Sequence, residues 1–435
     1  MNEAHPVGLV VEDDLHRNRL TVFFRLLLGI PHYIWLTLWS IGVVVVVIVN
    51  WFATLILGRP PRRLHRFLCA YVRYTVHLNA YLYLLANPYP GFTGEEGEYP
   101  VDVRLPADPQ TQSRWKTLFR VILGIPSFVL AAFLGGATGP TLNTLFFRGS
   151  SRRGGRGSTG GGGSGGLLAG VCAVFGWFAS LVLGRMPRGL RDAGVYGVGY
   201  GAQVLAYVLL VTDRYPSTDP AALLESVSPP PPHPVSLVGD AHDLHRSRVT
   251  VFFRLPLAIP HFVWLFLWTV VVEIVAVLNW FTTLIIGRPA RPFYRFTAAY
   301  LRYQLHVWAF VTLAANPFPG FTGAPGAYPL DLVLPDEPQR QHRAKTLFRL
   351  LLIVPAWVIG AVLLYAAFVA AFFTWFVALA LGEAPWGLRN LMAYGLRYQA
   401  QLNAYLFLIT DRYPHASPLE GREEPQQQEL EFSLA

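Results

Sequence analysis

The sequence is poor in charged residues and in cysteine, and each scarcity excludes a class of protein. Only 14% of the 435 residues are charged, whereas a soluble domain carries about 25%. Two cysteines, Cys69 and Cys172, lie in apolar segments outside any CxxC or Cys/His cluster, so we expect no disulfide framework and no metal site. The motifs GxxxxGKS and HExxH are also lacking, and we expect no cofactor and no soluble-enzyme chemistry.

The sequence contains three long runs of apolar residues. Hydrophobic residues make up 53% of the chain, and the mean hydropathy is +0.37. Residues 31–58 hold no residue charged at neutral pH, with His32 as the one side chain that could become so, and the runs 260–287 and 355–382 hold a single acid between them, Glu273. Crossing a hydrocarbon core takes about 20 helical residues. Each run is therefore long enough to span a membrane.

Four short turn segments are rich in Gly, Pro and Arg, at 58–66, 184–191, 287–295 and 382–389, and they hold 11 of the 35 Lys and Arg residues. The net charge is +9. In a chain with this many apolar residues, we expect basic turns to bind anionic lipid headgroups and not nucleic acid. The predicted headgroup anchors are Arg59, Arg62, Arg63, Arg185, Arg188, Arg288 and Arg291.

Internal repeats organise the chain. Residues 15–92 align with 244–321 without a gap, and each half divides again, because LFRVILGIP at 118–126 resembles FFRLLLGIP at 23–31. We therefore predict a first half and a second half of two units each, separated by a Pro-rich linker and followed by a polar tail. The predicted boundaries are 1–216 (units 5–92 and 99–216), 217–233 (linker), 234–415 (units 234–321 and 328–415) and 416–435 (tail).

Each unit repeats one pattern of elements. It opens with an alternating segment such as HPVGLVV at 5–11, which predicts a short strand. A basic amphipathic segment follows, where Arg17 and Arg25 fall on one stripe of a helix expected to lie in the membrane interface. An apolar helix, a basic turn and a second helix of mixed polarity complete the unit. The fold class predicted is an all-α membrane bundle of about eight transmembrane helices, with short β segments and interfacial helices on one face.

The same pattern predicts a topology. Both termini and all four strands are expected on one side of the cell membrane, and the four basic turns on the other. An even number of spans favours the cytoplasm for the termini, whereas the arginines of the turns favour it for the turns, so two orientations are open. Because a single short strand is not stable alone, we expect the strands to pair with one another or with a partner chain and so to join the two halves. The Gly/Ser/Arg-rich stretch at 150–166 is expected to be a flexible excursion into water.

The combined motifs resemble an uncharacterised bacterial membrane-protein family, catalogued as domain of unknown function 4389. The carriers are LFRVILGIP at 118–126, LVLGRMPRGL at 181–190, and TDRYP at 212–216 and again at 410–414. The resemblance covers nearly the whole chain, about once per half or once per unit. It implies a tandem membrane architecture and supplies no activity.

Polar residues recur in register within the second helices. Arg73 and His77 are four residues apart and therefore share one helix face. One interpretation is a polar site or path inside the membrane, and the other is hydrogen bonding between helices with arginines reaching toward the basic turns. Glu273 and His306 have matched depths, so we expect them to pair. The predicted intramembrane polar site comprises Arg73, Tyr74, His77, Glu273, Arg302, Tyr303, His306, Arg397 and Gln401.

Three functions are open at this point. The first is a non-catalytic membrane scaffold or accessory protein that binds lipid and engages a protein partner, or a second copy of itself, through the strand-bearing face. The second is a transporter or channel that uses the Arg/His/Tyr residues as a path. The third is a lipid-modifying membrane enzyme, which lacks a visible carboxylate pair or nucleophile–base arrangement.

Overall fold

The computed structural model describes residues 5–135, 166–239 and 244–421. The chain separates into two compact units, Met1–Val227 and Ser228–Ala435, and these are called the first and second halves below. The division falls inside the predicted linker. The linker is not wholly extended, because Pro220–Leu223 forms a short helix that packs against the first half. Residues 150–165 of the predicted flexible stretch lie outside the described part of the chain.

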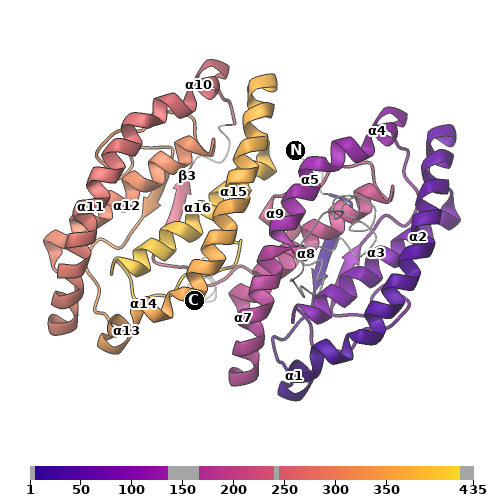
Figure 1. Cartoon of the computed structure of the whole chain (residues 1–435), viewed down its shortest axis with the longest axis horizontal. Coiled ribbons are helices and arrows are strands. Elements are labelled where there is room, and N and C mark those ends of the chain that lie inside the picture. Colours follow the sequence, from indigo (N-terminus) through magenta and orange to yellow (C-terminus); the bar gives the residue numbers. More distant parts are fainter. Residues whose placement is uncertain (1–4, 136–165, 240–243, 422–435) are drawn as a thin grey trace, which may run out of the picture. The chain divides into compact units, whose positions relative to one another are not determined.

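Both halves are mostly helical and run through a matching order of elements (Figure 1). The first half comprises β1 (Gly8–Val11), α1 (Arg19–Leu28), α2 (Ile30–Leu57), α3 (Arg62–Leu82), β2 (Val101–Arg104), α4 (Arg114–Leu118), α5 (Arg120–Leu134), α7 (Leu167–Leu183), α8 (Arg188–Val208) and α9 (Pro220–Leu223). The second half comprises β3 (Ser236–Gly239), α10 (Arg248–Phe252), α11 (Arg254–Ile286), α12 (Arg291–Val311), β4 (Leu330–Val333), α13 (Arg343–Leu347), α14 (Arg349–Leu352), α15 (Val354–Leu381) and α16 (Trp386–Leu406).

The long apolar helices end where the sequence places a glycine. Gly58 after α2 and Gly287 after α11 have φ of 72° and 80°. Only glycine adopts this left-handed conformation without steric cost, and proline follows because it cannot continue a helix. The basic turns are therefore sharp C-terminal helix caps, and the next helix starts within a few residues.

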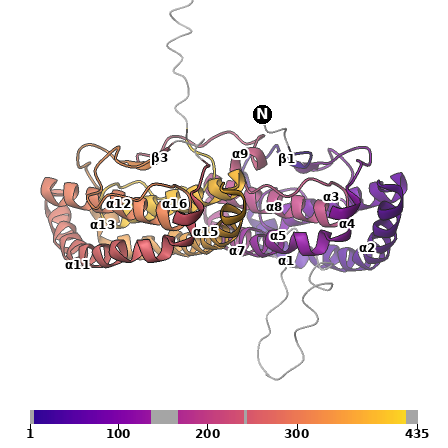
Figure 2. The ribbon, with the colours of Figure 1, turned by 90° about the horizontal axis from the view of Figure 1, so that it is seen from above.

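Each half is built of three layers. The two strands lie on one side, the second helices of the two units form the middle, and the apolar first helices form the other side. In Figure 2 the strand layer of the first half is marked by β1, the middle layer by α3 and α8, and the apolar layer by α2, α5 and α7. Contacts agree with this order, since β2 packs on α3, β1 packs on α8, and α2, α5 and α7 pack on those two helices. The middle helices are the most buried elements, and 18 residues of α8 are buried.

The strands pair as expected, but only within each half. β1 pairs antiparallel with β2, with Gly8 opposite Arg104, and β3 pairs antiparallel with β4, with Ser236 opposite Val333. In the described part of the chain no sheet joins the two halves, so that part of the prediction is wrong. Two consecutive units already supply both partners that a two-stranded sheet needs.

Three stretches among the described residues are long and apolar enough to cross a membrane: Arg19–Leu57, Arg254–Ile286 and Val354–Leu381. The helices Arg120–Leu134 and Leu167–Leu183 are apolar but shorter. The middle helices α3, α8, α12 and α16 are long enough but do not qualify, because their composition is too polar. The predicted count of eight spanning helices is therefore not confirmed.

The predicted separation of strands and turns across the membrane is wrong. The Gln112 N–H, just after the second strand segment, donates a 2.9 Å hydrogen bond to the Gly58 carbonyl in a basic turn. Arg62 of the same turn lies 3.7 Å from Asp108, and Arg291 lies 3.0 Å from Glu337. The two units of each half run antiparallel, so each turn meets the segment that follows the neighbouring unit's strand.

Candidate functional site

A buried ion pair joins the middle layer to the strands of the first half. His77 Nε2 of α3 lies 2.9 Å from Asp102 Oδ1 of β2, and Arg73 Nε lies 3.4 Å from the same oxygen. Arg73 also donates to Glu96 at 3.1 Å. Arg73 and His77 share a helix face, as predicted, but that face meets a strand and not the interior of a helix bundle.

The carboxylate of Asp102 is held in its charged form. Burial raises its pKa, whereas hydrogen bonds from His77 and from the backbone N–H groups of Gly97 and Val103, both at 2.7 Å, lower it. The hydrogen bonds outweigh the desolvation, and the net pKa lies below its ordinary value. Asp102 is not among the residues predicted from the sequence, although the repeated Asp of the second and fourth strand segments is visible there.

The second half repeats the pair with one change. His306 Nε2 lies 2.7 Å from Asp331 Oδ1, and the N–H groups of Gly326 and Leu332 donate to the carboxylate. Burial again raises the pKa of Asp331, and the bonds from His306 and the backbone lower it below its ordinary value. Arg302 Nε donates instead to the Leu332 carbonyl at 3.2 Å.

Glutamine replaces the His–Asp pair in the other two units. Gln203 donates to the Val7 carbonyl at 2.8 Å and Gln401 donates to the Val235 carbonyl at 3.0 Å. Arg397 donates to the Ser417 carbonyl at 2.6 Å and lies 3.7 Å from Glu420. Gln203 and Gln401 therefore join their helices to the residue just before a strand, and Arg397 joins α16 to the segment that follows α16.

The two tyrosines of the predicted site face the other way. The Tyr74 hydroxyl lies 2.8 Å from His32 Nδ1 of α2, and the Tyr303 hydroxyl lies 2.8 Å from His261 Nδ1 of α11. They join the middle layer to the apolar layer. The structure thus divides the predicted polar site into strand-facing Arg, His and Gln residues and tyrosines that face the apolar helices.

The predicted pair between Glu273 and His306 is wrong. Glu273 is exposed on α11, and His306 binds Asp331. Among the described residues no ion pair joins Glu273 to His306 or to Arg302. Matching depths along two helices ignores the direction of the side chains, and His306 points toward the strands on the far side of α12 from α11.

The sequence did not predict that each unit buries an arginine near the start of its apolar helices. Arg25 is 2% exposed and donates to the carbonyls of Tyr81 and Ala86 at the end of α3, at 2.6 and 3.1 Å. Its guanidinium lies over the Tyr81 ring. From the sequence we expected Arg25 to lie at a membrane interface, whereas in the structure its side chain caps the C-terminal end of α3. The matching residues of the other units are Arg120, Arg254 and Arg349, each bonded in the same way.

The tryptophans of the apolar helices join neighbouring units. Trp51 Nε1 donates to the Thr117 carbonyl at 2.9 Å, and Trp177 Nε1 donates to the Val22 carbonyl at 3.0 Å. Trp280 and Trp375 make the matching bonds to Thr346 and Val251 in the second half. Each unit thereby donates one indole N–H to the first basic helix of its neighbour.

The predicted headgroup anchors lie mostly at the surface. Arg188 is partly buried, and the other predicted anchors are exposed: Arg59, Arg62, Arg63, Arg185, Arg288 and Arg291. Arg62 and Arg291 pair with acids only through exposed contacts, which contribute little to stability. Their charges stay available to an anionic surface.

Within the described residues, no group of three or more His, Cys, Asp or Glu side chains could hold a metal ion. Cys69 and Cys172 are free thiols and both are buried. The polar clusters described above join helices to strands through hydrogen bonds and ion pairs, although buried nitrogens such as His77 Nδ1 and Arg25 Nε have no hydrogen-bond partner in the described part of the chain. Their geometry supports a structural role more directly than a catalytic one.

Comparison with known families finds four tandem matches. The family model described as Domain of unknown function (DUF4389) matches residues 19–93, 163–218, 248–322 and 343–417. Neither a search of curated proteins nor a search of solved structures finds a match. Three of the matched segments begin near the basic helix of their unit, whereas the second, 163–218, begins just before α7. All four end after the second helix of the unit, and none includes the opening strand.

Proposed function

The chain belongs to the DUF4389 family, and we propose that it is a non-catalytic membrane scaffold whose apolar helices lie in lipid. The strands and loops would face water and engage a protein partner or a second copy of the chain. The observation that carries the proposal is the orientation of the first helices, which turn large apolar side chains outward and arginine inward.

Helix α1 illustrates this orientation. Phe23 and Leu26 are 59% and 73% exposed, whereas Arg25, between them in sequence, is 2% exposed. A helix on a water-soluble surface has the opposite pattern, with charge outward and apolar residues inward. Exposed apolar residues on this scale mark a protein or membrane interface, and lipid is the environment in which this orientation is stable.

The same orientation recurs in the other units. Arg120 is buried while Ile122 is exposed in α5, and Arg254 is buried while Leu255 is exposed in α11. In α14, Arg349 is buried while Leu350 is exposed. Because the orientation occurs in all four units, we infer that each unit needs an apolar environment on this face. A protein partner covering one patch would not require the pattern in every unit.

We further propose that the apolar layer lies in one leaflet, with its helices roughly parallel to the membrane surface. On the opposite side of the first half, Arg104 and Glu225 face each other at 4.0 Å with side chains 64% and 71% exposed. If α2 crossed the bilayer, the adjoining strand layer would be carried into hydrocarbon with its charges and open strand edges. Neither is stable there.

The exposed turn arginines support this placing. They lie at the ends of the apolar helices, where arginine side chains can reach phosphate groups at the surface. We propose that Arg59, Arg63, Arg185 and Arg288 bind anionic headgroups. Binding would then weaken as salt rises, because screening reduces the attraction between exposed charges.

The competing arrangement, with eight crossing helices, makes a different prediction of depth. Spin labels placed on the exposed face of α2, at Ile34, Ile41, Ile48 and Ile56, sample about 33 Å of helix. If the helix lies in one leaflet, the four labels should show similar access to oxygen and little access to a water-soluble nickel reagent. A crossing helix would show deep labels in the centre and shallow labels at both ends.

The labelling requires variants in which the buried residues Cys69 and Cys172 are replaced by alanine. A label at the strand-side residue Arg104 provides the aqueous control, because it should be accessible to the nickel reagent when the apolar layer lies in one leaflet. A symmetric profile along α2, with accessible ends, would rule out insertion into a single leaflet.

A transporter or channel remains the alternative proposal. The polar residues that suggested a path are engaged inside each half, His77 by Asp102 and Gln401 by the Val235 carbonyl. A path would need such groups to be hydrated and free. In the scaffold proposal these polar residues hold the middle helices against the strands of the same half, and for this reason we favour it.

A further inference from the structure

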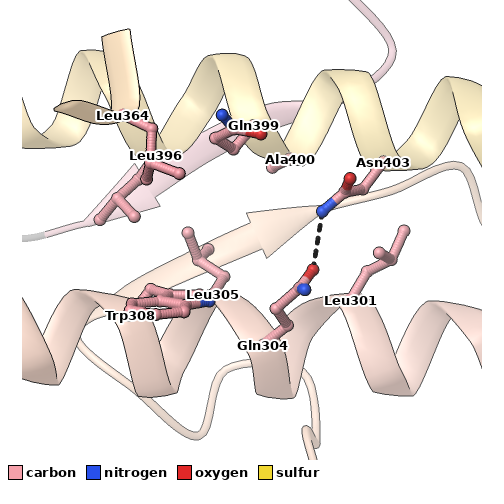
Figure 3. A pocket seen from close by; sticks show the side chains of 9 residues that line it. All are labelled: Leu301, Gln304, Leu305, Trp308, Leu364, Leu396, Gln399, Ala400 and Asn403. Atoms are coloured by element: carbon pink, nitrogen blue, oxygen red, sulfur yellow. Dashed lines mark hydrogen bonds between the residues drawn. The ribbon is translucent and has the colours of Figure 1, made fainter. Parts of the chain in front are cut away.

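A pocket of about 250 Å³ lies in the second half, between α12 and α16 (Figure 3). Its walls come from one face of each helix, within Leu301–Trp308 and within Leu396–Asn403, and Leu364 of α15 adds to them. Figure 3 shows the side chains of both helices pointing into the gap. The lining contains no charged residue.

Three side-chain amides distinguish this pocket, which is called the amide pocket below. Asn403 Nδ2 donates to Gln304 Oε1 at 2.8 Å, and Gln399 Nε2 donates to the Gly360 carbonyl at 2.8 Å. These bonds use the nitrogen atoms as donors. Among the described residues, no donor reaches Asn403 Oδ1 or Gln399 Oε1, so two acceptor oxygens are left for a ligand.

The amide pocket lies on the face of its helices that is turned away from the strands. Gln304 and His306 are two residues apart, which corresponds to a rotation of about 200° around the helix, and His306 binds Asp331 of β4. Trp308 lies between the apolar helices, with its ring centre 5.9 Å from that of Phe262 and 5.6 Å from that of Phe368. A ligand therefore enters from the side of α11 and α15.

We propose that the amide pocket binds the head of a neutral, hydroxyl-bearing lipid, of the monoacylglycerol type. Two hydroxyls match the two acceptor oxygens, and the lining has no cationic side chain to pair with the charge of a phosphate. The volume is slightly below that of a pocket for a drug-sized molecule, so it takes the head while the acyl chain stays along α11 or α15. The inference rests on the proposed placing of these helices in lipid.

The amide pocket is specific to the second half. At the positions that match Gln304, Gln399 and Asn403, the first half has Thr75, Gly201 and Leu205. The Thr75 hydroxyl is already bonded to the Tyr71 carbonyl at 2.8 Å, and Gly201 and Leu205 are buried. The repeat architecture does not require the amides, which is expected if they serve a ligand.

Binding of three lipids with one acyl chain tests the proposal on the full-length protein in detergent, by native mass spectrometry. We expect monooleoylglycerol to bind, and methyl oleate, which lacks hydroxyls, and lysophosphatidic acid, which is charged, to bind at least about tenfold more weakly. Replacing Gln399 and Asn403 together by Leu removes both acceptors. It should weaken monooleoylglycerol about tenfold, because each hydrogen bond contributes roughly a two- to tenfold change, and leave methyl oleate unchanged.

Two further variants test whether the loss of binding comes from the amide pocket and not from a general effect on the fold. Ala400→Leu keeps all three amides but fills the pocket, and it should also lose monooleoylglycerol. Asn79→Leu removes an amide from α3 of the first half and should bind like the wild type. Wild-type binding by both pocket variants, or tighter binding of lysophosphatidic acid, would overturn the amide pocket. The α2 depth profile tests the lipid-facing layer separately, so failure of the layer and failure of the pocket are distinguishable.

Discussion

The guanidinium of Arg25 lies 4.4 Å from the centre of the Tyr81 ring and donates a 2.6 Å hydrogen bond to the Tyr81 carbonyl. The same side chain thus closes the C-terminal end of α3 and stacks on its last aromatic residue. Arg120 repeats both contacts with Tyr207 in the next unit. This relationship couples the first basic helix of a unit to the end of its second helix.

Replacing Arg25 by methionine should lower the free energy of unfolding by about 2–4 kcal/mol, because two buried carbonyls lose their donor. Chemical unfolding in detergent, followed by circular dichroism, measures the change. Arg19→Met is the matched control, since Arg19 is exposed and caps only the Val182 carbonyl, and it should cost less than about 1 kcal/mol. Equal effects of the two variants would contradict the capping role.

Asp102→Asn should destabilise the first half by about 1–3 kcal/mol at neutral pH, because charge-assisted hydrogen bonds are lost. The pKa of Asp102 in the folded state is below its ordinary value of 3.8. Its contribution is therefore fully present above about pH 5 and is lost as the pH falls through the lowered pKa.

The measurement is the thermal midpoint of wild type and Asp102→Asn between pH 7 and pH 2. The difference between them should shrink progressively as the pH falls below about 5. Asp331→Asn should behave alike, since the pKa of Asp331 is lowered by the same kinds of bond. A difference that grew as the pH fell would show that the carboxylates are protonated in the folded protein.

Gly197→Ala should destabilise the first half, because an added Cβ would lie 2.4 Å from the Leu134 carbonyl oxygen, and backbone cannot move away cheaply. Overpacking of this kind costs about 1–3 kcal/mol. Gly170→Ala is the matched control in α7, where a Cβ meets nothing within 4 Å, and it should be neutral or stabilise slightly. Thermal unfolding of both variants decides the comparison.

Leu26→Lys should weaken binding to vesicles, because a charge would enter the apolar layer at a cost of about 2.5–3.5 kcal/mol. Leu350→Lys, at the matching exposed position of the second half, should act in the same way. Vesicle flotation of detergent-released protein gives the bound fraction. Arg104→Gln, on the strand side, serves as the control and should float like the wild type.

Several features of the fold follow from sequence patterns alone. The tandem units are visible in repeated motifs and agree with four family matches. The ends of the apolar helices at Gly58 and Gly287 follow from Gly-Arg-Pro, because this combination terminates a helix in any surroundings. The strand segments also follow from local alternation. These are features that nearby residues decide.

The polar site could be predicted only in part. Arg73 and His77 share a face because four residues complete about one helical turn, and this needs no tertiary information. Their partner, Asp102, lies 25 residues further along the chain than His77. Periodicity gave no direction for that face, so a strand-facing ion pair and an intramembrane path were equally compatible with the sequence.

The sequence by itself determined the repeat, the helix boundaries and the apolar character of the first helices, because local composition and periodicity carry them. Only the tertiary structure decided which side of each helix those residues face. The bond between Gln112 and Gly58 and the burial of Arg25 depend on how antiparallel units pack. Hydropathy counts apolar residues without regard to their neighbours, so it could not distinguish eight crossing helices from an apolar layer beneath a buried middle layer.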